Sequence, residues 1–364
     1  KLTRQANGHR AATTICGSVR SGRGRSTNAA ATPRSVAPPR KSCASKRSPR
    51  SATKRSFAFT VRATDSGTPH LTTTATLSIT VRPAVQAAVY VTNGGNSSVR
   101  SFPLGASGDT APSTLLAGAA TGLNGTGAIT IDPTGRTYVA SLNTPAIEEF
   151  DYAATGNTAP VATISGPSTG LAYPSALTVD AAGRLFVANY TAGTVTIYAA
   201  GASGDAAAIA TLGGPHTLLA GPTALAITNG NTLWVANLST NTLLGFSLPA
   251  SGDQAPFAQI AGPSTGLNGP QGLVAESDTR LLVANTYGRT ITEFATSARG
   301  DTAPLRTIAG AATGLAFPHG IDVDEQGSIW VANEFAGIEQ FASTATGNAA
   351  PLRTRRPFGR PPTQ

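Results

Sequence analysis

Serines that could act as nucleophiles lie in a motif that occurs twice. The segment G-P-S-T-G at 166–170 and 262–266 matches the G-x-S-x-G pattern of serine hydrolases. That pattern requires a strand, a sharp turn and a helix, whereas here the motif precedes another strand. The corresponding segment 118–122 carries Ala in place of Ser168. The sequence therefore predicts loop serines and no catalytic nucleophile.

Four acidic residues and one asparagine also recur, once per loop and 48 residues apart. The series is Asp109, Asn157, Asp205, Asp253 and Asp301. A calcium site takes about six to eight oxygen ligands, so one carboxylate per loop is too sparse to form one. We expect each of these side chains to form an Asx turn between the third and fourth strands of a repeat.

Metal ligands are scarce elsewhere in the repeats. A second acidic series closes the first strand in four repeats, and Thr228 breaks it in the remaining one; its members are Asp132, Asp180, Glu276 and Asp324. Only His216 and His319 accompany it, and neither has a partner at metal-ligand spacing. The residues themselves predict no metal site and no cofactor.

The elements that carry these residues form a repeat of 48 residues. The tripeptide V-T-N ends at Asn93. It recurs as V-A-S ending at Ser141 and as V-A-N ending at Asn189, Asn237, Asn285 and Asn333. One cycle, 173–213, contains four short runs rich in Val, Ile, Leu, Thr, Tyr or Phe, separated by turn residues. A fixed period with four strands per unit is typical of a β-propeller, in which each blade covers its neighbours.

A count of the strands predicts an all-β, six-bladed propeller with an irregular first blade. The second strand occurs six times, but the first, inner strand occurs only five times, at 127–132, 175–180, 223–228, 271–276 and 319–324. A closing strand is expected after residue 354 and is not found there. Two alternatives stay open: the ring is unclosed at its termini, or residues 79–84, offset by 48 from 127–132, supply the missing strand.

The chain divides into four parts. Residues 1–56 hold 14 Lys or Arg and no acidic residue, and are expected to be disordered. Residues 57–83 predict a β-hairpin, residues 84–354 the propeller, and residues 355–364 a disordered tail. The basic segment and the tail are interpreted as out-of-frame translation or as the ends of a fragment. Beyond residue 56 there are 13 basic and 18 acidic residues, so a nucleic-acid partner is not expected.

Three segments resemble known families. V-Y-V-T-N at 89–93 matches the YVTN-type propeller repeat, and P-S-A-L-T-V-D-A-A-G-R-L-F-V-A-N at 174–189 resembles the NHL repeat, with Asn where that repeat has Asp. The hairpin at 57–83 resembles the last strands of a bacterial Ig-like or cadherin-like domain. The propeller resemblance covers 89–354. It also implies an enzymatic alternative, because lactonase-type and streptogramin-lyase-type propellers hold a metal at the channel mouth.

Residues that differ between repeats are the candidates for recognition. The recurring asparagines are interpreted as structural turn residues: Asn93, Asn189, Asn237, Asn285 and Asn333. In a propeller, the loops that lead to the first strand and the turns after the second strand share one face. Aromatic side chains are enriched at binding hot spots. The candidate ligand-binding residues on this face are Tyr173, Tyr190, His216, Gln271, Tyr287, Phe317, His319, Glu334 and Phe335.

These observations favour a non-catalytic binding or scaffold protein. The expected partner is a protein or a carbohydrate, bound by a monomeric propeller without a membrane span. The Ig-like resemblance and the Gly, Ala, Thr and Ser content imply an extracellular or cell-envelope location in a bacterium. Two alternatives stay open: a lactonase- or lyase-like enzyme with a metal at the channel mouth, and a structural spacer without a ligand.

Overall fold

The computed structural model describes residues 55–64, 72–81 and 88–355, except 153 and 335–336, and describes side chains only from residue 88 onward. The chain forms two compact units, residues 1–83 and 84–364. The predicted disordered segment 1–56 lies almost wholly outside the described residues, as does the tail except for Arg355.

The first unit contains a two-stranded antiparallel hairpin. Strand β1 (Arg55–Thr64) pairs with β2 (Thr72–Val81), from Arg55 opposite Val81 to Thr64 opposite Thr72. The period-two alternation of both segments agrees with this pairing. An Ig-like origin of the hairpin stays a prediction.

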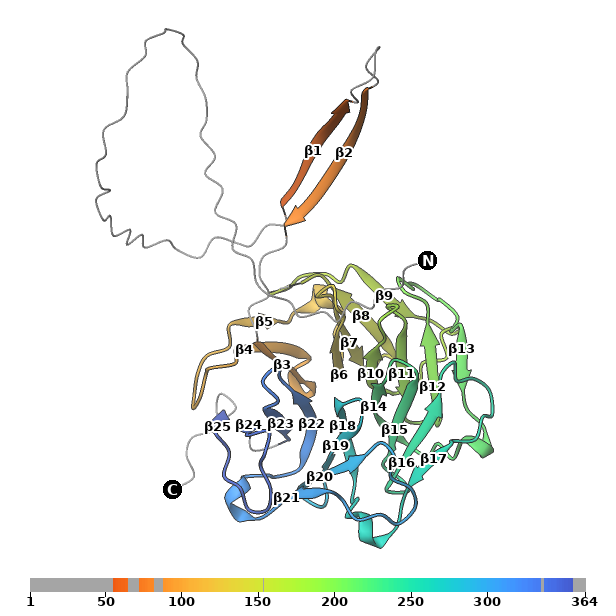
Figure 1. The fold of residues 1–364 in the computed structure, drawn as a ribbon, viewed down its shortest axis with the longest axis vertical. Helices are drawn as coiled ribbons and strands as arrows, with labels where there is room; N and C mark the ends of the chain where they lie inside the picture. The colour runs from red at the N-terminus through yellow and green to blue at the C-terminus, as the bar shows by residue number, and fades with distance from the viewer. Residues whose placement is uncertain (1–54, 65–71, 82–87, 153, 335–336, 356–364) are drawn as a thin grey trace, which may run out of the picture. The chain divides into compact units, whose positions relative to one another are not determined.

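The second unit is a ring of six blades, coloured from orange to dark blue in Figure 1. Blades two to six each consist of four antiparallel strands in sequence order. Blade two contains β6 (Thr126–Ile131), β7 (Thr137–Ser141), β8 (Ala146–Phe150) and β9 (Ala162–Ser165). Blade three contains β10 (Pro174–Val179), β11 (Leu185–Asn189), β12 (Thr194–Tyr198) and β13 (Ala210–Leu212). Blade four contains β14 (Pro222–Thr228), β15 (Thr232–Asn237), β16 (Thr242–Ser247) and β17 (Ala258–Ile260).

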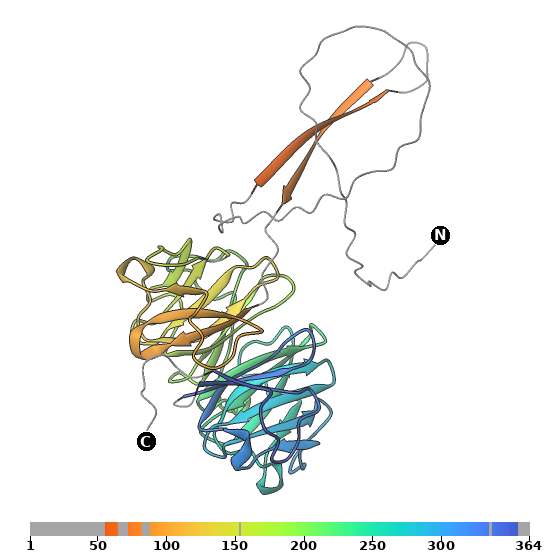
Figure 2. The ribbon, with the colours of Figure 1, turned by 90° about the vertical axis from the view of Figure 1, so that its left-hand side faces the viewer.

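The last two blades and the first complete the ring. Blade five contains β18 (Pro270–Ser277), β19 (Arg280–Asn285), β20 (Thr290–Ala295) and β21 (Arg306–Ile308). Blade six contains β22 (Pro318–Val323), β23 (Ile329–Asn333), β24 (Gly337–Phe341) and β25 (Arg353–Arg355). Blade one has three strands among the described residues: β3 (Ala88–Asn93), β4 (Ser98–Pro103) and β5 (Thr114–Leu116). The side view in Figure 2 shows no layer of helices on either face of the ring, and the described residues contain only short 3₁₀ turns.

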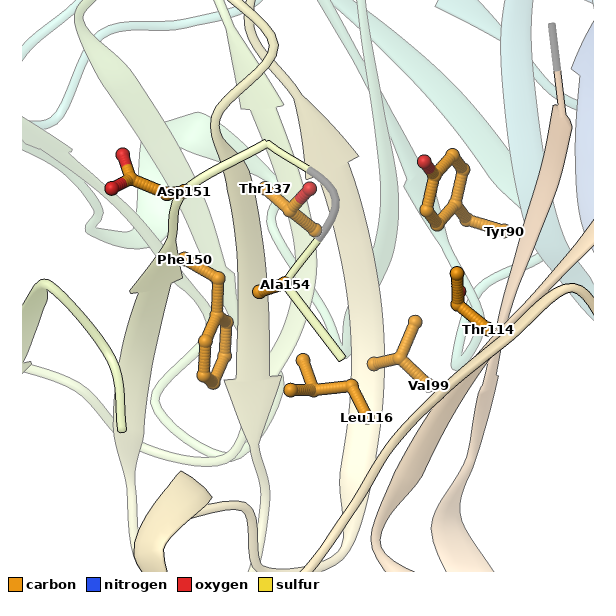
Figure 3. Close-up of a pocket in the computed structure, with 8 residues that line it drawn as sticks. All are labelled: Tyr90, Val99, Thr114, Leu116, Thr137, Phe150, Asp151 and Ala154. Carbon is orange, nitrogen blue, oxygen red and sulfur yellow. The ribbon is translucent and has the colours of Figure 1, made fainter. Parts of the chain in front are cut away.

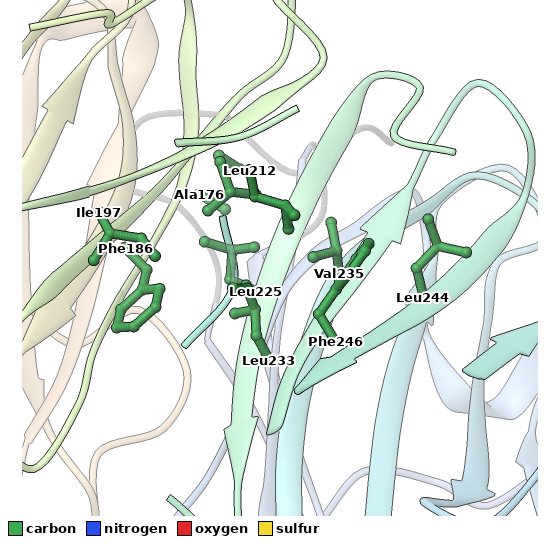
Figure 4. Close-up of a cluster of buried hydrophobic side chains, with 12 residues drawn as sticks. Ala176, Phe186, Ile197, Leu212, Leu225, Leu233, Val235, Leu244 and Phe246 are labelled. Atoms are coloured by element: carbon green, nitrogen blue, oxygen red, sulfur yellow. The ribbon is translucent and has the colours of Figure 1, made fainter. Parts of the chain in front are cut away.

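The hydrophobic core lies between the blades. Between blades three and four, Phe186 and Leu212 pack against Leu225 and Phe246 (Figure 4). Blades three, four and five bury both faces in this way, because side chains alternate between the two faces of a strand. Full burial of one such side chain contributes about 1.5–3 kcal/mol, so the junctions between blades supply most of the stability.

A repeated latch joins neighbouring blades along the outer perimeter. The fourth strand of each blade forms a parallel bridge with a glycine in the third-to-fourth-strand loop of the next, as Ile164 does with Gly204. The acidic residue after that glycine then reaches back: the backbone N–H of Ser168 donates to Asp205 Oδ1 at 2.7 Å. Asn157, Asp253, Asp301 and Asn348 accept equivalent bonds at their own junctions. These side chains link two blades, so the predicted Asx turns within one blade are not what they form.

The same latch closes the outer edge of the ring. Arg355 of β25 forms the parallel bridge with Gly108 of blade one, and the Gly108 N–H donates to Thr354 O at 2.9 Å. Blades six and one are thus joined as the other five pairs are, which completes the six-bladed ring. The inner strand of blade one is missing from the described residues, so irregularity is confined to the inner side of that blade.

Candidate ligand-binding face

The recurring asparagines fasten each connecting loop to its blade. Asn189, Asn237, Asn285 and Asn333 are buried, and the Oδ1 atom of each accepts a backbone N–H from 17 residues upstream, at 2.9–3.2 Å. In blade two the Oγ atom of Ser141 accepts the corresponding bond from the Asn124 N–H at 3.0 Å. Asn93 is exposed, and its side chain caps nothing. The buried amides hold the loop-bearing side of the ring in one conformation.

That side of the ring is here called the loop face, formed by the turns after the second strands and the connections that precede the first strands. One backbone hydrogen bond joins these two segments in blades two to six, for example from Tyr190 N to Tyr173 O at 3.1 Å and from Glu334 N to Phe317 O at 3.1 Å. The two loop types therefore share one face, as the sequence predicts.

Two aromatic residues of the loop face occupy a left-handed backbone position. The residue before the first strand has a positive φ in all five complete blades: Gly125 (67°), Tyr173 (55°), Gly221 (59°), Gly269 (68°) and Phe317 (56°). Glycine adopts this conformation without steric cost, whereas a bulky side chain there is strained by about 1–3 kcal/mol. Blades three and six thus retain aromatic side chains at a position that favours glycine.

These aromatic side chains form two groups. In blade three the ring centroids of Tyr173 and Tyr190 are 5.9 Å apart, and Tyr173 is 43% exposed. In the second group the Arg289 guanidinium lies 4.8 Å from the centre of the Phe317 ring. Tyr287, 59% exposed, lies over Gly269, whose α-carbon leaves no room for a side chain beneath it. Blades three and six are opposite each other in a ring of six, so the two groups lie on opposite sides of the loop face.

Polar residues occupy a bulge at the start of the inner strands of blades three to six, whereas blade two has Gly127 there. In each of blades three to six the pairing of the first and second strands shifts register at the residue after the proline. The residues at this shift are therefore equivalent: Ser175, Thr223, Gln271 and His319. The hydroxyls of Ser175 and Thr223 donate to the first carbonyl of the next inner strand, Pro222 O at 2.6 Å and Pro270 O at 2.7 Å. In blade five Thr286 Oγ1 donates to Pro318 O instead, at 2.7 Å, so Gln271 is not required for that link.

His319 is the ionisable residue of this inner series. Its Nε2 atom lies 3.7 Å from Glu334 Oε2, and both side chains are about half exposed, at 45% and 48%. Burial lowers the pKa of His319, and the Glu334 carboxylate partly opposes that shift. The imidazole is therefore neutral at neutral pH, and it can donate or accept one hydrogen bond at the inner rim.

Of the remaining predicted site residues, one lies away from the loop face and one lies outside the described residues. His216 is on a 3₁₀ turn at the outer rim, where its Nδ1 atom is 2.6 Å from Asp253 Oδ2 in the latch between blades. Phe335 falls outside the described residues. The sequence prediction missed Arg289, although its equivalents Gly193 and Asn241 share its positive φ and an arginine there departs from the repeat.

The cavity in Figure 3 lies away from the loop face and is too small for a ligand. It is lined by blades one and two, from Tyr90 and Thr114 to Phe150 and Asp151, and its volume of about 10 Å³ is close to that of a single water probe. Residues 88–355, as far as described, hold no group of three His, Cys, Asp or Glu side chains able to bind a metal ion. No helix among the described residues is long and apolar enough to cross a membrane.

Two buried carboxyl groups lie within the blades, in third strands that begin at the loop face. Glu148 and Glu339 occupy equivalent positions in the third strands of blades two and six, each opposite a valine of the second strand, and are 2% exposed. Burial raises the pKa of each to about 7, and hydrogen bonds from Ser141 and Asn333 respectively oppose the shift. Blades three and five have threonines, Thr196 and Thr292, at this position.

The fold and the loop face together define an all-β propeller with a variable rim. No known family model and no curated protein matches the sequence. The chain is similar in structure to the WD40 β-propeller domain of Doa1, with a TM-score of 0.52 and 14% identity over 74% of this chain and 81% of that one. It is also similar to an inactive variant of virginiamycin B lyase from Staphylococcus aureus crystallised with quinupristin, with a TM-score of 0.50 and 14% identity over 79% and 86% of the chains. At this identity the likenesses show the fold alone.

Proposed function

We propose that this chain is a non-catalytic binding module whose ligand, a protein or a carbohydrate, contacts the loop face. The observation that carries the proposal is the retention of Tyr173 and Phe317 at backbone positions where three sister blades have glycine. Backbone strain of this kind clusters at functional sites, so these two aromatic side chains are the first candidates for ligand contact.

The chemistry of the face supports recognition by stacking and by hydrogen bonding. Aromatic rings offer a large contact area at a low cost in side-chain entropy. The Arg289 guanidinium over Phe317, together with Gln271 and the neutral His319, adds donors and acceptors between the two aromatic groups. Rigid loops, each fixed by a buried amide or hydroxyl, keep these groups in place before the ligand arrives.

The proposal is tested by applying the full chain to arrays of glycans and extended peptides. We expect at least one ligand class to bind to the wild-type chain and to lose tenfold or more in affinity in a Tyr173→Ala, Tyr287→Ala, Phe317→Ala variant. The matched control is Phe257→Ala, because Phe257 is 49% exposed and packs under Arg299 outside the loop face. Binding that responds equally to the control and to the triple variant would refute the proposal.

A lyase- or lactonase-like activity is the second candidate, favoured by the His319–Glu334 pair at the inner rim and by the likeness to the virginiamycin B lyase fold. Crystals soaked in divalent metals, together with turnover of cyclic depsipeptides and lactones, test this alternative. Activity abolished by His319→Ala, or a metal held by three protein ligands at the rim, would favour the enzyme over the binding module.

A further inference from the structure

The inner edge of blade one carries an unpaired strand. In blades two to six the second strand pairs with a first strand on its inner side, as β11 pairs with β10. Among the described residues β3 holds the second-strand place but pairs only with β4. Its inner edge therefore presents backbone N–H and C=O groups that can accept another strand.

One wall of the adjoining space is apolar and uncovered. Ile129 and Ile131 of β6 face blade one, since Ile129 packs with Val99 and Leu116 and Ile131 lies two residues further along the same strand. Ile129 is half-buried and Ile131 is 42% exposed. By contrast Leu177, Leu225 and Leu273, which are equivalent to Ile129, are 6–7% exposed because a neighbouring inner strand covers them.

The opposite wall carries a carboxylate. Gly320 and Asp322 of β22 are exposed, whereas the equivalent Ala224 and Ala226 of blade four are buried against the next blade. Asp322 corresponds to Val274 of blade five. Val274 packs into the same core cluster as Ile321 and Val323, the fourth and sixth residues of the next inner strand counted from its proline. An inner strand of blade one would thus bring its fourth and sixth residues to Asp322.

We propose that this slot binds an extended segment of a partner protein as the first strand of blade one. The slot is defined by the inner edge of β3, Ile129 and Ile131 on one wall, and Gly320 and Asp322 on the other. Main-chain hydrogen bonds to β3 would supply affinity, and alternate side chains would supply specificity, as in other cases of β-strand addition.

The walls determine the chemistry of the segment. The five inner strands of this chain indicate a small third residue, a branched aliphatic fourth residue and a small fifth residue, because Ala224 and Ala226 meet the wall that corresponds to Ile129 and Ile131. Asp322 calls for Lys or Arg at the sixth residue, where the sister strands have Val, Ile or Ala. Residues 79–84 have the matching 48-residue offset, but Ile79 and Val81 already pair with Phe57 and Arg55 within the hairpin.

The binding test uses the full chain and two fluorescent peptides. The first has the sequence of residues 174–182, Pro-Ser-Ala-Leu-Thr-Val-Asp-Ala-Ala, and the second has Lys in place of Val. We expect both to bind saturably at one site, tenfold or more tighter than scrambled peptides. The Lys peptide should bind about threefold tighter than the Val peptide, as for a partly exposed ion pair, and this advantage should vanish in Asp322→Asn and at high salt.

Two variants identify the slot itself. Ile131→Asp, at a position already exposed, should weaken both peptides tenfold or more, whereas the control Val161→Asp, at a residue 50% exposed in another loop, should leave binding unchanged. Binding to the wild-type chain no tighter than that of scrambled peptides would overturn the proposal. Binding that appears only after Val81→Asp would also overturn it, since the chain's own residues 79–84 would then occupy the slot.

Discussion

Replacement of Arg355 by isoleucine is expected to stabilise the ring, because this arginine occupies a position built for an aliphatic side chain. The equivalent residues at the other five blade junctions are Leu116, Ile164, Leu212, Ile260 and Ile308, which are 0–4% exposed. Arg355 is 2% exposed. Burial, and to a lesser extent the charge of Arg353, lowers its pKa, yet the guanidinium stays charged at neutral pH.

The magnitude follows from the contacts of the guanidinium. Its Nε atom donates to Ala106 O at 2.9 Å, Nη2 donates to Pro103 O, and the group lies 5.2 Å and 5.4 Å from the ring centres of Phe102 and Trp330. Nη1 is buried without a hydrogen-bond partner, which costs about 1–3 kcal/mol. Cation–π contacts return about 0.5–2 kcal/mol, and no carboxylate neutralises the charge among the ion pairs described. An isoleucine removes the desolvation cost and adds aliphatic burial, for a net gain of about 1–3 kcal/mol.

The assay is thermal and urea-induced unfolding of the full chain at pH 7. A gain of this size raises Tm by about 3–8 °C in a domain of this length. Arg353→Lys is the control: Arg353 is exposed two residues earlier in the same strand, lysine keeps its charge and can still donate to Gln340, and the replacement should change stability by less than about 0.5 kcal/mol. A lower Tm for Arg355→Ile than for the wild-type chain would show that the arginine is a net stabilising contact and would refute the reasoning.

Three further predictions concern stability. Folding raises the pKa of Glu148 and Glu339 from 4.5 to about 7, so the folded chain binds protons more tightly than the unfolded chain. Stability should therefore fall as pH rises from about 4.5 through 7, by up to about 3 kcal/mol for each group. Urea midpoints at pH 5 and pH 8 measure this fall, and an unchanged pH slope in the double variant Glu148→Gln, Glu339→Gln would contradict it. Asp205→Ala removes the latch bonds from the Ser168 N–H and Oγ and should cost about 1–2 kcal/mol, measured by urea unfolding, with exposed Glu325→Ala as a control for loss of charge alone. Asn285→Ala removes the buried amide that accepts the Asn268 N–H and should cost about 1–2 kcal/mol, whereas exposed Asn93→Ala should be neutral. Equal Tm losses in the two variants would be inconsistent with a structural role for the buried amides.

The sequence predicts the architecture because a propeller repeats one unit in one environment. The period of 48, the six second strands and the five inner strands from 127–132 to 319–324 agree with the observed blades to within about two residues. Sequence spacing cannot show which blade a loop side chain reaches, so the sequence predicts a turn within one blade for Asp205 and not the latch with Ser168. The contact joins residues 37 positions apart and depends on how two blades pack.

The sequence identifies only part of the candidate site, for the same reason. Variation between repeats is visible in the sequence, and it identified Tyr173, Tyr287 and Phe317. The sequence does not show that Tyr173 and Phe317 have positive φ angles, because backbone conformation at a loop residue depends on the hydrogen bond that the Tyr190 or Glu334 N–H makes to it. Arg289 was missed because its importance lies in its position over a ring in the next blade.

The most direct test of the central claim, that strained aromatic residues are kept on the loop face for binding, is a comparison of the wild-type chain with Tyr173→Gly, Phe317→Gly. Isotherms for the ligand class found on the arrays should weaken tenfold or more in the variant, while its free energy of unfolding stays equal to or above that of the wild type. Undiminished binding, or a loss of stability above about 2 kcal/mol, would mean that the rings are held there for packing alone.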